Sequence, residues 1–361
     1  DFPGALVKPI RAMLATALTT MTALEVVLFG KNNVALFAVV KVPRFQIAPH
    51  VANLPRMKPM PDFTTERVTW SAAEEAGVEL WVRRLDAIDS PAPGNKAWKL
   101  MYHVERALLQ PQPALLTFGG GWSNHLHATA ALGASIGLRT IGVVRATEAE
   151  LAHPTPTLQD CINWGMELFP VSRSEYKEKD APFFKAWLRD RFGNPYIVPE
   201  GGSGALGVMG CKHLIEHAAL ERPWDAVVVA AGTGATAAGL LLGLKGTANL
   251  YVANALKGLD MGPAIEHQLN LALNDFAWSK ELASHCTVWN DAHLGGFGQI
   301  PESLQSFIGS WEGETGIPLD GVYTGKALHR LEQAWREDPD WSGRRVLFIH
   351  SGGLQGNRSW R

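Results

Sequence analysis

Short apolar runs that alternate with helical stretches constrain the fold of this chain more than any other feature. From Val68 onward the runs are rich in β-branched residues, and most precede stretches that open at Gly, Ser, Asn or Thr. They lie at Val78–Val82, Leu115–Phe118, Thr140–Val144, Tyr196–Val198, Ala226–Ala230, Leu250–Val252 and Val346–Ile349. This alternation favours an α/β architecture of mostly parallel sheets flanked by helices. Ligands of such sheets bind beyond the carboxyl ends of the strands, so the chemistry is expected in the loops there.

Composition narrows the kind of ligand. A chain of 361 residues can bury the cores of about two domains. Its net charge of −2 gives no electrostatic support for nucleic-acid binding, which leaves a small molecule. The 3 cysteines show no C-x-x-C pairing, so a reducing, cytoplasmic setting is expected. No metal site is expected, because His125 and His127 are spaced too closely to share one face of a helix.

The first sixty residues differ from the rest. They are basic and contain two apolar stretches, Met13–Phe29 and Val34–Val42. Glu25 interrupts the first stretch, which falls short of the roughly 18 apolar residues of a membrane span. We expect an extension that takes no part in the chemistry. An anchor on a membrane surface is the weaker alternative.

The first loop of interest brings a lysine to a helix start. A turn rich in Pro and Gly precedes Lys96, and a helix is predicted over Ala97–Leu109. Most lysines are solvated surface charges, and that interpretation stays open here. A cation at a helix N-terminus is electrostatically misplaced, however, and a cofactor aldehyde bonded to the amine would account for it. Lys99 lies inside the helix and is expected to be structural.

Two further loops are suited to anions. Three glycines at 119–121 precede Ser123 and Asn124, which open a helix whose free N–H groups could bind a carboxylate. Ordinary helix capping is the alternative. The loop Gly232–Thr236 follows a buried strand and resembles a phosphate cradle. A dinucleotide site is disfavoured, because the strand that ends at Asn254 lacks the acidic residue that binds a ribose.

Taken in order, these loops resemble those of fold-type II pyridoxal-phosphate enzymes, which have a tryptophan synthase β-like fold. The finer resemblance is to the D-cysteine desulfhydrase / 1-aminocyclopropane-1-carboxylate deaminase family. It implies a large cofactor-binding domain over 62–98 and 205–361 and a small domain over 99–204. The atypical N-terminal extension over 1–61 has no counterpart in this resemblance. Six segments carry the resemblance: residues 94–100, 120–125, 199–203, 232–236, 319–326 and 348–353.

The resemblance also implies roles for individual residues. Lys96 would hold pyridoxal 5'-phosphate covalently and move the proton at the substrate Cα, and Tyr323 would act as an acid/base or positioning group. The residues implied to bind the cofactor are Lys96, Asn124, Gly232, Thr233, Gly234, Ala235, Thr236 and Ser351. Those implied to face the substrate are Ser123, Asn124, His125, Phe297 and Tyr323. Ser123 would meet the carboxylate and, as a further catalytic residue, assist proton transfer. Glu200 receives no role.

Departures from the family pattern bear on the reaction. Thr324 stands where the cyclopropane-opening enzymes have a glutamate near the pyridine nitrogen, and Ser351 offers that nitrogen only a hydroxyl. A largely unprotonated ring is a weaker electron sink, which favours β-elimination over ring opening. Phe297 replaces a tyrosine and removes a phenol donor. Gly321, where proline is frequent, is expected to loosen the loop that carries Tyr323.

The leading hypothesis is a pyridoxal-phosphate-dependent lyase that eliminates a β-substituent from a small amino acid, such as D-cysteine. The first alternative is deamination of 1-aminocyclopropane-1-carboxylate to 2-oxobutyrate and ammonia. The second is a protein that binds the cofactor without useful turnover. The resemblance further implies a homodimer, and no nucleic-acid or membrane partner is expected.

Overall fold

The computed structural model describes residues 21–29, 35–43, 63–221 and 223–361. The chain forms two compact units, Asp1–Asn53 and Leu54–Arg361. In the first unit, strand β1 (Met21–Phe29) pairs antiparallel with β2 (Ala35–Pro43). The rest of the predicted extension over 1–61, including the start of the apolar stretch Met13–Phe29, lies outside the described residues.

A six-stranded sheet organises the second unit, in the order β11-β10-β9-β12-β4-β3. Every neighbouring pair is parallel except β3 and β4, which are antiparallel. β12 lies in the interior of the sheet and pairs with both β4 and β9. The strands are β3 (Thr65–Arg67), β4 (Glu79–Arg84), β9 (Ala226–Ala231), β10 (Asn249–Asn254), β11 (Cys286–Trp289) and β12 (Arg345–His350).

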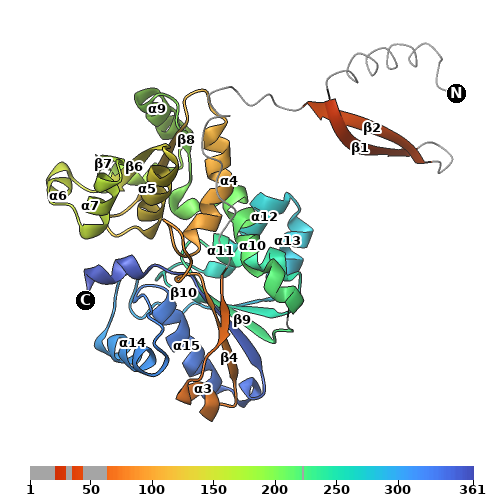
Figure 1. Ribbon diagram of the computed structural model, residues 1–361, viewed down its shortest axis with the longest axis vertical. Helices are drawn as coiled ribbons and strands as arrows, with labels where there is room; N and C mark the ends of the chain where they lie inside the picture. Colours follow the sequence, from red (N-terminus) through yellow and green to blue (C-terminus); the bar gives the residue numbers. More distant parts are fainter. Residues whose placement is uncertain (1–20, 30–34, 44–62, 222) are drawn as a thin grey trace. The chain divides into compact units, whose positions relative to one another are not determined.

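Helices cover both faces of this sheet, because alternate side chains of each central strand point to opposite sides. In β9, Val227 and Val229 join one buried cluster, whereas Val228 joins the other. Figure 1 shows α10–α13 on one side of β4 and β9, and α14 and α15 on the other. These helices are α10 (Ala205–Glu221), α11 (Ala235–Leu244), α12 (Met261–Leu273), α13 (Phe276–Ala283), α14 (Glu302–Thr315) and α15 (Thr324–Glu337); α3 (Ser71–Glu75) lies with the second group.

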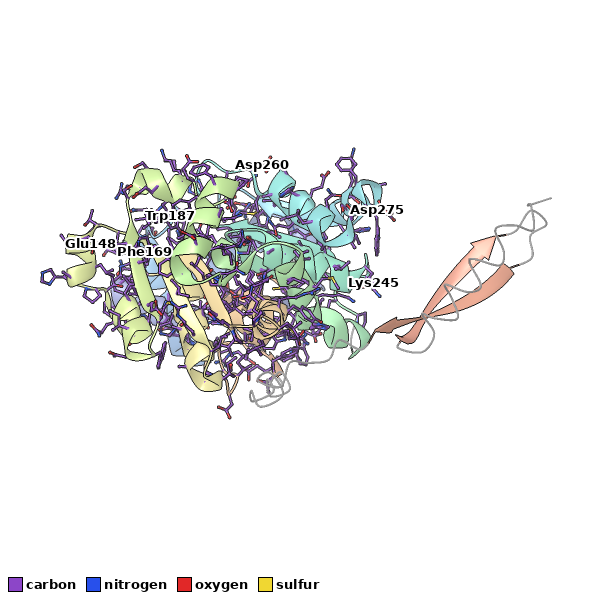
Figure 2. All side chains as sticks on the ribbon, turned by 90° about the horizontal axis from the view of Figure 1, so that it is seen from above. Glu148, Phe169, Trp187, Lys245, Asp260 and Asp275 are labelled. Atoms are coloured by element: carbon purple, nitrogen blue, oxygen red, sulfur yellow. The ribbon has the colours of Figure 1, made fainter. Side chains whose placement is uncertain are left out.

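A four-stranded parallel sheet forms from the middle of the chain, in the order β7-β6-β5-β8. Its strands are β5 (Ala114–Gly119), β6 (Arg139–Arg145), β7 (Glu167–Val171) and β8 (Tyr196–Ile197). The connecting helices are α5 (Asn124–Ile136), α6 (Glu148–Ala152), α7 (Pro156–Asn163), α8 (Arg173–Lys177) and α9 (Pro182–Phe192). Phe169 and Trp187, labelled in Figure 2, are tilted against each other with ring centroids 5.8 Å apart. Helix α4 (Lys96–Leu108) links the two sheets.

The predicted α/β fold with mostly parallel sheets is confirmed. Local signals place the helix starts: Asp260 and Asp275, labelled in Figure 2, cap α12 and α13 by accepting backbone N–H groups. Within the described part of the chain, each helix falls short of the length or the apolar character that crossing a bilayer requires.

Candidate active site

Lys96 is the first residue of α4, and its neighbour Asn95 ties it to the glycine-threonine loop. The Lys96 Nζ donates to Asn95 Oδ1 at 2.9 Å, while Asn95 Nδ2 donates to Thr236 Oγ1 at 2.9 Å. Asn95 is buried. The Asn95 amide therefore joins two segments that are 141 residues apart in the sequence. The sequence analysis included Asn95 only as part of the motif around Lys96.

The surroundings of Lys96 favour a neutral amine. Burial and, to a lesser extent, the nearby Lys99 together lower the pKa of Lys96 to about 7, against the opposing effects of Cys211 and Asp320. A neutral amine is the nucleophilic form of lysine, so a large share of Lys96 can attack an aldehyde near neutral pH.

Lys99 does more than support the helix. Its side chain is buried, and its Nζ donates to Thr233 Oγ1 at 3.4 Å, within the loop predicted to cradle a phosphate. Burial lowers the pKa of this amine as well. The expectation of a structural role missed this contact. Spacing could have revealed it, because residues three apart share one face of a helix.

The N-terminus of α5 shows the helix capping that the sequence left open as the alternative to a carboxylate site. Ser123 caps the helix by accepting from Leu126 N at 3.2 Å, and Asn124 Oδ1 accepts from Gln355 Nε2. His125 is turned inward, with Nε2 2.8 Å from Thr117 Oγ1. Its buried Nδ1 has no partner among the described residues. Burial, then Lys96 and Lys99, lowers the pKa of His125 well below its ordinary value, so the ring is neutral.

The segment after β8, at residues 200–202, packs against the Gly232–Thr236 loop and against the first turn of α5. Gly201 and Gly202 have φ of 68° each, a conformation that favours glycine. A Cβ on Gly201 would lie 2.9 Å from Thr233 Cγ2, and one on Gly202 would lie 3.2 Å from His125 Cε1. Glu200, which precedes them, accepts from Tyr176 Oη at 2.7 Å. The segment that follows β8 therefore packs closely against Thr233, Lys99 and His125.

Tyr323 faces the glycine-threonine loop from the other side. A Cβ on Gly232 would lie 3.3 Å from Tyr323 Oη. Burial, then Asp320, raises the pKa of Tyr323, so its phenol keeps the proton. Asp320 is itself a cap for α15: its carboxylate accepts from the N–H groups of Val322, Tyr323 and Thr324 at 2.8–3.0 Å.

Thr324 is committed to the same cap. Its Oγ1 donates to Asp320 Oδ2 at 2.7 Å, and the side chain is fully buried. Gly321 does not loosen this loop as expected, since its N–H donates to Asn357 Oδ1 at 3.1 Å. A Cβ there would lie 3.0 Å from Trp360 Nε1, so the position is tightly packed. Proline could not make this bond because it lacks the N–H.

Ser351 and Phe297 lie at the edges of the site. Ser351 follows β12, and its carbonyl accepts from Asn95 N at 3.0 Å, directly beside Lys96. Phe297 is exposed, and its ring is edge-on to Tyr323 with centroids 5.9 Å apart. The structure therefore brings all twelve predicted site residues into one connected region.

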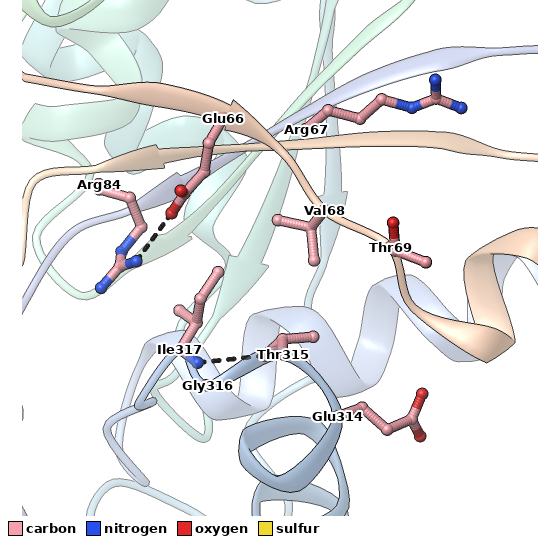
Figure 3. Close-up of a pocket in the computed structure, with 9 residues that line it drawn as sticks. All are labelled: Glu66, Arg67, Val68, Thr69, Arg84, Glu314, Thr315, Gly316 and Ile317. Atoms are coloured by element: carbon pink, nitrogen blue, oxygen red, sulfur yellow. Dashed lines mark hydrogen bonds and ion pairs between the residues drawn. The ribbon is translucent and has the colours of Figure 1, made fainter.

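A separate pocket of about 300 Å³ lies elsewhere in the second unit. Figure 3 shows that it is lined by Glu66, Arg67, Val68, Thr69, Arg84, Glu314, Thr315, Gly316 and Ile317. None of the predicted site residues lines it. Among the described residues, no group of three or more His, Cys, Asp or Glu side chains could hold a metal ion. His125 and His127 engage different partners, since His127 Nε2 lies 3.1 Å from Asp160.

The site fits a phosphorylated aldehyde. A buried amine of lowered pKa can bond to the aldehyde, and the N-terminus of α11 with the Thr233 and Thr236 hydroxyls and the Lys99 amine can hold a phosphate. The unpartnered Nδ1 of buried His125 beside these lysines indicates a polar group still to be bound there. Fold and site together define the class of pyridoxal-phosphate-dependent enzymes.

Comparison with known proteins gives the family. The family model described as pyridoxal-phosphate dependent enzyme matches residues 64–265, more than half of the chain. The chain belongs to this family, in the branch of the D-cysteine desulfhydrases and 1-aminocyclopropane-1-carboxylate deaminases. It is thus an enzyme of the lyase or deaminase type with pyridoxal phosphate as cofactor.

Curated relatives support the branch. A bifunctional D-cysteine desulfhydrase/1-aminocyclopropane-1-carboxylate deaminase, named as mitochondrial, from Arabidopsis thaliana is 30% identical over 296 residues, 78% of this chain and 73% of that protein. D-cysteine desulfhydrase from Serratia proteamaculans is 29% identical, over 84% of this chain and 95% of that protein.

Solved structures agree. The crystal structure of a 1-aminocyclopropane-1-carboxylate deaminase homologue, 28% identical, covers 85% of this chain and 94% of that chain with a TM-score of 0.69. Threonine deaminase isoform 2 from Solanum lycopersicum shares the fold at 13% identity, with a TM-score of 0.58 over 81% of this chain and 83% of that chain.

Proposed function

We propose that this enzyme eliminates a β-substituent from a small amino acid, with D-cysteine as the leading substrate. The balanced reaction converts D-cysteine and water to pyruvate, ammonia and hydrogen sulfide. The choice of β-elimination over ring opening rests on the hydrogen bonds that Thr324 and Asp320 already make. The Asp320 carboxylate already accepts four hydrogen bonds, one of them from Thr324 Oγ1, so neither group is positioned as a free acid for the cofactor's ring nitrogen.

The residues of the site are proposed to have separate roles in the reaction. When bound, pyridoxal phosphate supplies an electron sink that stabilises negative charge at the substrate Cα. We propose that Lys96 holds the cofactor's aldehyde and, once released by substrate, takes the Cα proton, which its low pKa suits. The N–H groups at the start of α5, with Ser123, orient the carboxylate. Tyr323 keeps its proton and can donate it to the departing sulfur.

The remaining contacts serve the cofactor. The Gly232–Thr236 loop and α11 are proposed to hold the phosphate, with Lys99 as an added countercharge. Asn124 is proposed to hydrogen-bond the ring hydroxyl, and the Ser351 hydroxyl to face the ring nitrogen. Domain boundaries at 62–98 with 205–361 and at 99–204, a homodimer and a cytoplasmic setting belong to the same proposal.

The test begins with the purified protein, reduced with borohydride and digested. The cofactor tag should map to Lys96, and a Lys96→Ala variant should lose both the visible absorbance of the bound cofactor and turnover. A tag at any other residue, or full activity of Lys96→Ala, contradicts the proposal. Lys280→Met, which removes an exposed lysine on α13, is the matched control.

Parallel assays separate the alternatives. Sulfide and pyruvate from D-cysteine support the elimination. Release of 2-oxobutyrate from 1-aminocyclopropane-1-carboxylate at a higher kcat/KM would replace it with deamination, the second activity in the Arabidopsis relative's name. If the protein binds the cofactor but forms no product from any D- or L-amino acid, the second alternative, a cofactor-binding protein without useful turnover, is supported instead.

A further inference from the structure

Lys326 is a buried cation that the proposed chemistry does not use. It lies on α15, three residues after Tyr323, and its side chain is 1% exposed. Its Nζ donates to the carbonyls of His293 and Gly296, each at 2.8 Å. Burial lowers the pKa of Lys326 to about 8, against the opposing effect of Asp320, so the amine is mostly protonated at pH 7. Both hydrogen bonds are therefore charge-assisted.

The two carbonyls belong to residues 293–298, here called the Phe297 loop. Its backbone is unusual: Leu294, Gly295, Gly296 and Gly298 have φ of 47°, 96°, 143° and 75°. The same two carbonyls also close its turns, accepting from Gly296 N at 3.1 Å and from Gln299 N at 3.2 Å. Leu294 packs partly buried against the core cluster that includes α14 and α15, and the buried Lys326 ammonium adds two charge-assisted hydrogen bonds to the backbone of the same loop.

The loop matters because of what it carries. The Phe297 ring is 55% exposed and meets Tyr323 edge-on, at 5.9 Å between centroids. Tyr323 in turn lies against Gly232. The N-terminal end of α15 thus places Tyr323 against the Gly232–Thr236 loop. One turn later, Lys326 binds the backbone of the loop that carries the Phe297 ring.

We propose that Lys326 is a positioning residue that holds the Phe297 loop, so that the Phe297 ring closes against Tyr323 over the side chain of the bound amino acid. This rests on the proposed function, in which Tyr323 and Phe297 face the substrate. The competing explanation is that Lys326 only fills space beneath the loop. That role predicts lost stability without a change in loop order or substrate affinity.

The test compares Lys326→Met, of similar length but without donors, with the wild-type holoenzyme. Hydrogen exchange in the peptide covering 293–299 should become faster, while the peptide covering 319–325 stays protected. KM for the amino acid should rise about tenfold with kcat changed less than about threefold. Lys280→Met, the loss of an exposed lysine, should change neither quantity.

A double-mutant cycle with Phe297→Ala makes the test specific. If Lys326 acts through Phe297, adding Lys326→Met to Phe297→Ala should raise KM by less than about twofold. Fully additive effects, or unchanged exchange in Lys326→Met, overturn the proposal. If Lys326→Met loses the cofactor absorbance, Lys326→Gln, which keeps one donor, replaces it. Should the wild type turn over no amino acid, the proposed function fails, and the exchange data alone decide the role of Lys326.

Discussion

At the scale of single residues, Lys96 should make cofactor capture depend on pH. Its pKa of about 7 lies well below that of a solvated lysine, because the side chain is desolvated and close to Lys99. The amine is protonated and unreactive below this value and neutral above it. Uptake of pyridoxal phosphate by the apoenzyme should therefore speed up as pH rises through about 7 and then level off, as followed by visible absorbance. A midpoint near that of a free lysine would contradict this.

Lys99 offers a second prediction at this scale. Lys99→Met removes the amine that lies 3.4 Å from Thr233 in the Gly232–Thr236 loop and that a bound phosphate would favour in its charged form. Because a charge-assisted bond in a buried site contributes about 1.5–3 kcal/mol, the Kd for pyridoxal phosphate should rise roughly 10- to 100-fold. Equilibrium dialysis against the cofactor measures the change, with Lys280→Met as the exposed control. An unaltered Kd would return Lys99 to a structural role.

The sequence predicted site residues where chemistry and motif coincide. Lys96 stands at a helix start, and the glycine-threonine loop follows a strand. It did not predict the supporting contacts of Asn95, Lys99 and Lys326, because each depends on a partner far along the chain. For a residue inside a helix, the spacing of the sequence shows which face of the helix the side chain occupies. Which residue it contacts depends on the tertiary structure.

At the scale of elements, all seven predicted runs are strands, each within two residues of its predicted bounds. The strands that were not predicted in the second unit lack a buried apolar run. β3 is three polar residues at an edge, β7 contains Pro170, and β11 is a partly exposed edge strand. Edge strands gain their order from one neighbour rather than from burial on both faces, so hydrophobic pattern alone does not identify them.

Close packing of α10 on α11 leads to a prediction about glycine. A Cβ at Gly239 of α11 would lie 2.5 Å from Cys211 Cβ and 2.7 Å from the Val208 carbonyl oxygen, both in α10. Gly239→Ala should therefore lower the free energy of unfolding by about 1–3 kcal/mol. At Gly309 of α14 a Cβ would meet nothing within 4 Å, so Gly309→Ala should raise it by up to about 1 kcal/mol. Urea unfolding measures both, and equal effects would refute the packing argument.

At the scale of the whole molecule, the two units should be separable in function. All predicted site residues and the matched span 64–265 lie in the unit Leu54–Arg361. A chain beginning at Leu54 should retain cofactor absorbance, turnover and solubility, because it keeps the six-stranded and the four-stranded sheet. Sedimentation with vesicles compares the two proteins. If the full chain binds vesicles and the chain beginning at Leu54 does not, the surface-anchor alternative for the first sixty residues is favoured instead.

The place of β12 has a consequence for biosynthesis. The strand nearest the carboxyl end of this chain is inserted between β4 and β9, and Ser351, just after it, binds Asn95 beside Lys96. While the polypeptide is still emerging from the ribosome, the facing edges of β4 and β9 have no partner, and the lysine's turn lacks its last support. Nascent chains arrested before Arg345 should consequently depend on chaperones and fail to acquire the coloured cofactor, so that cofactor loading reports the insertion of β12 between β4 and β9.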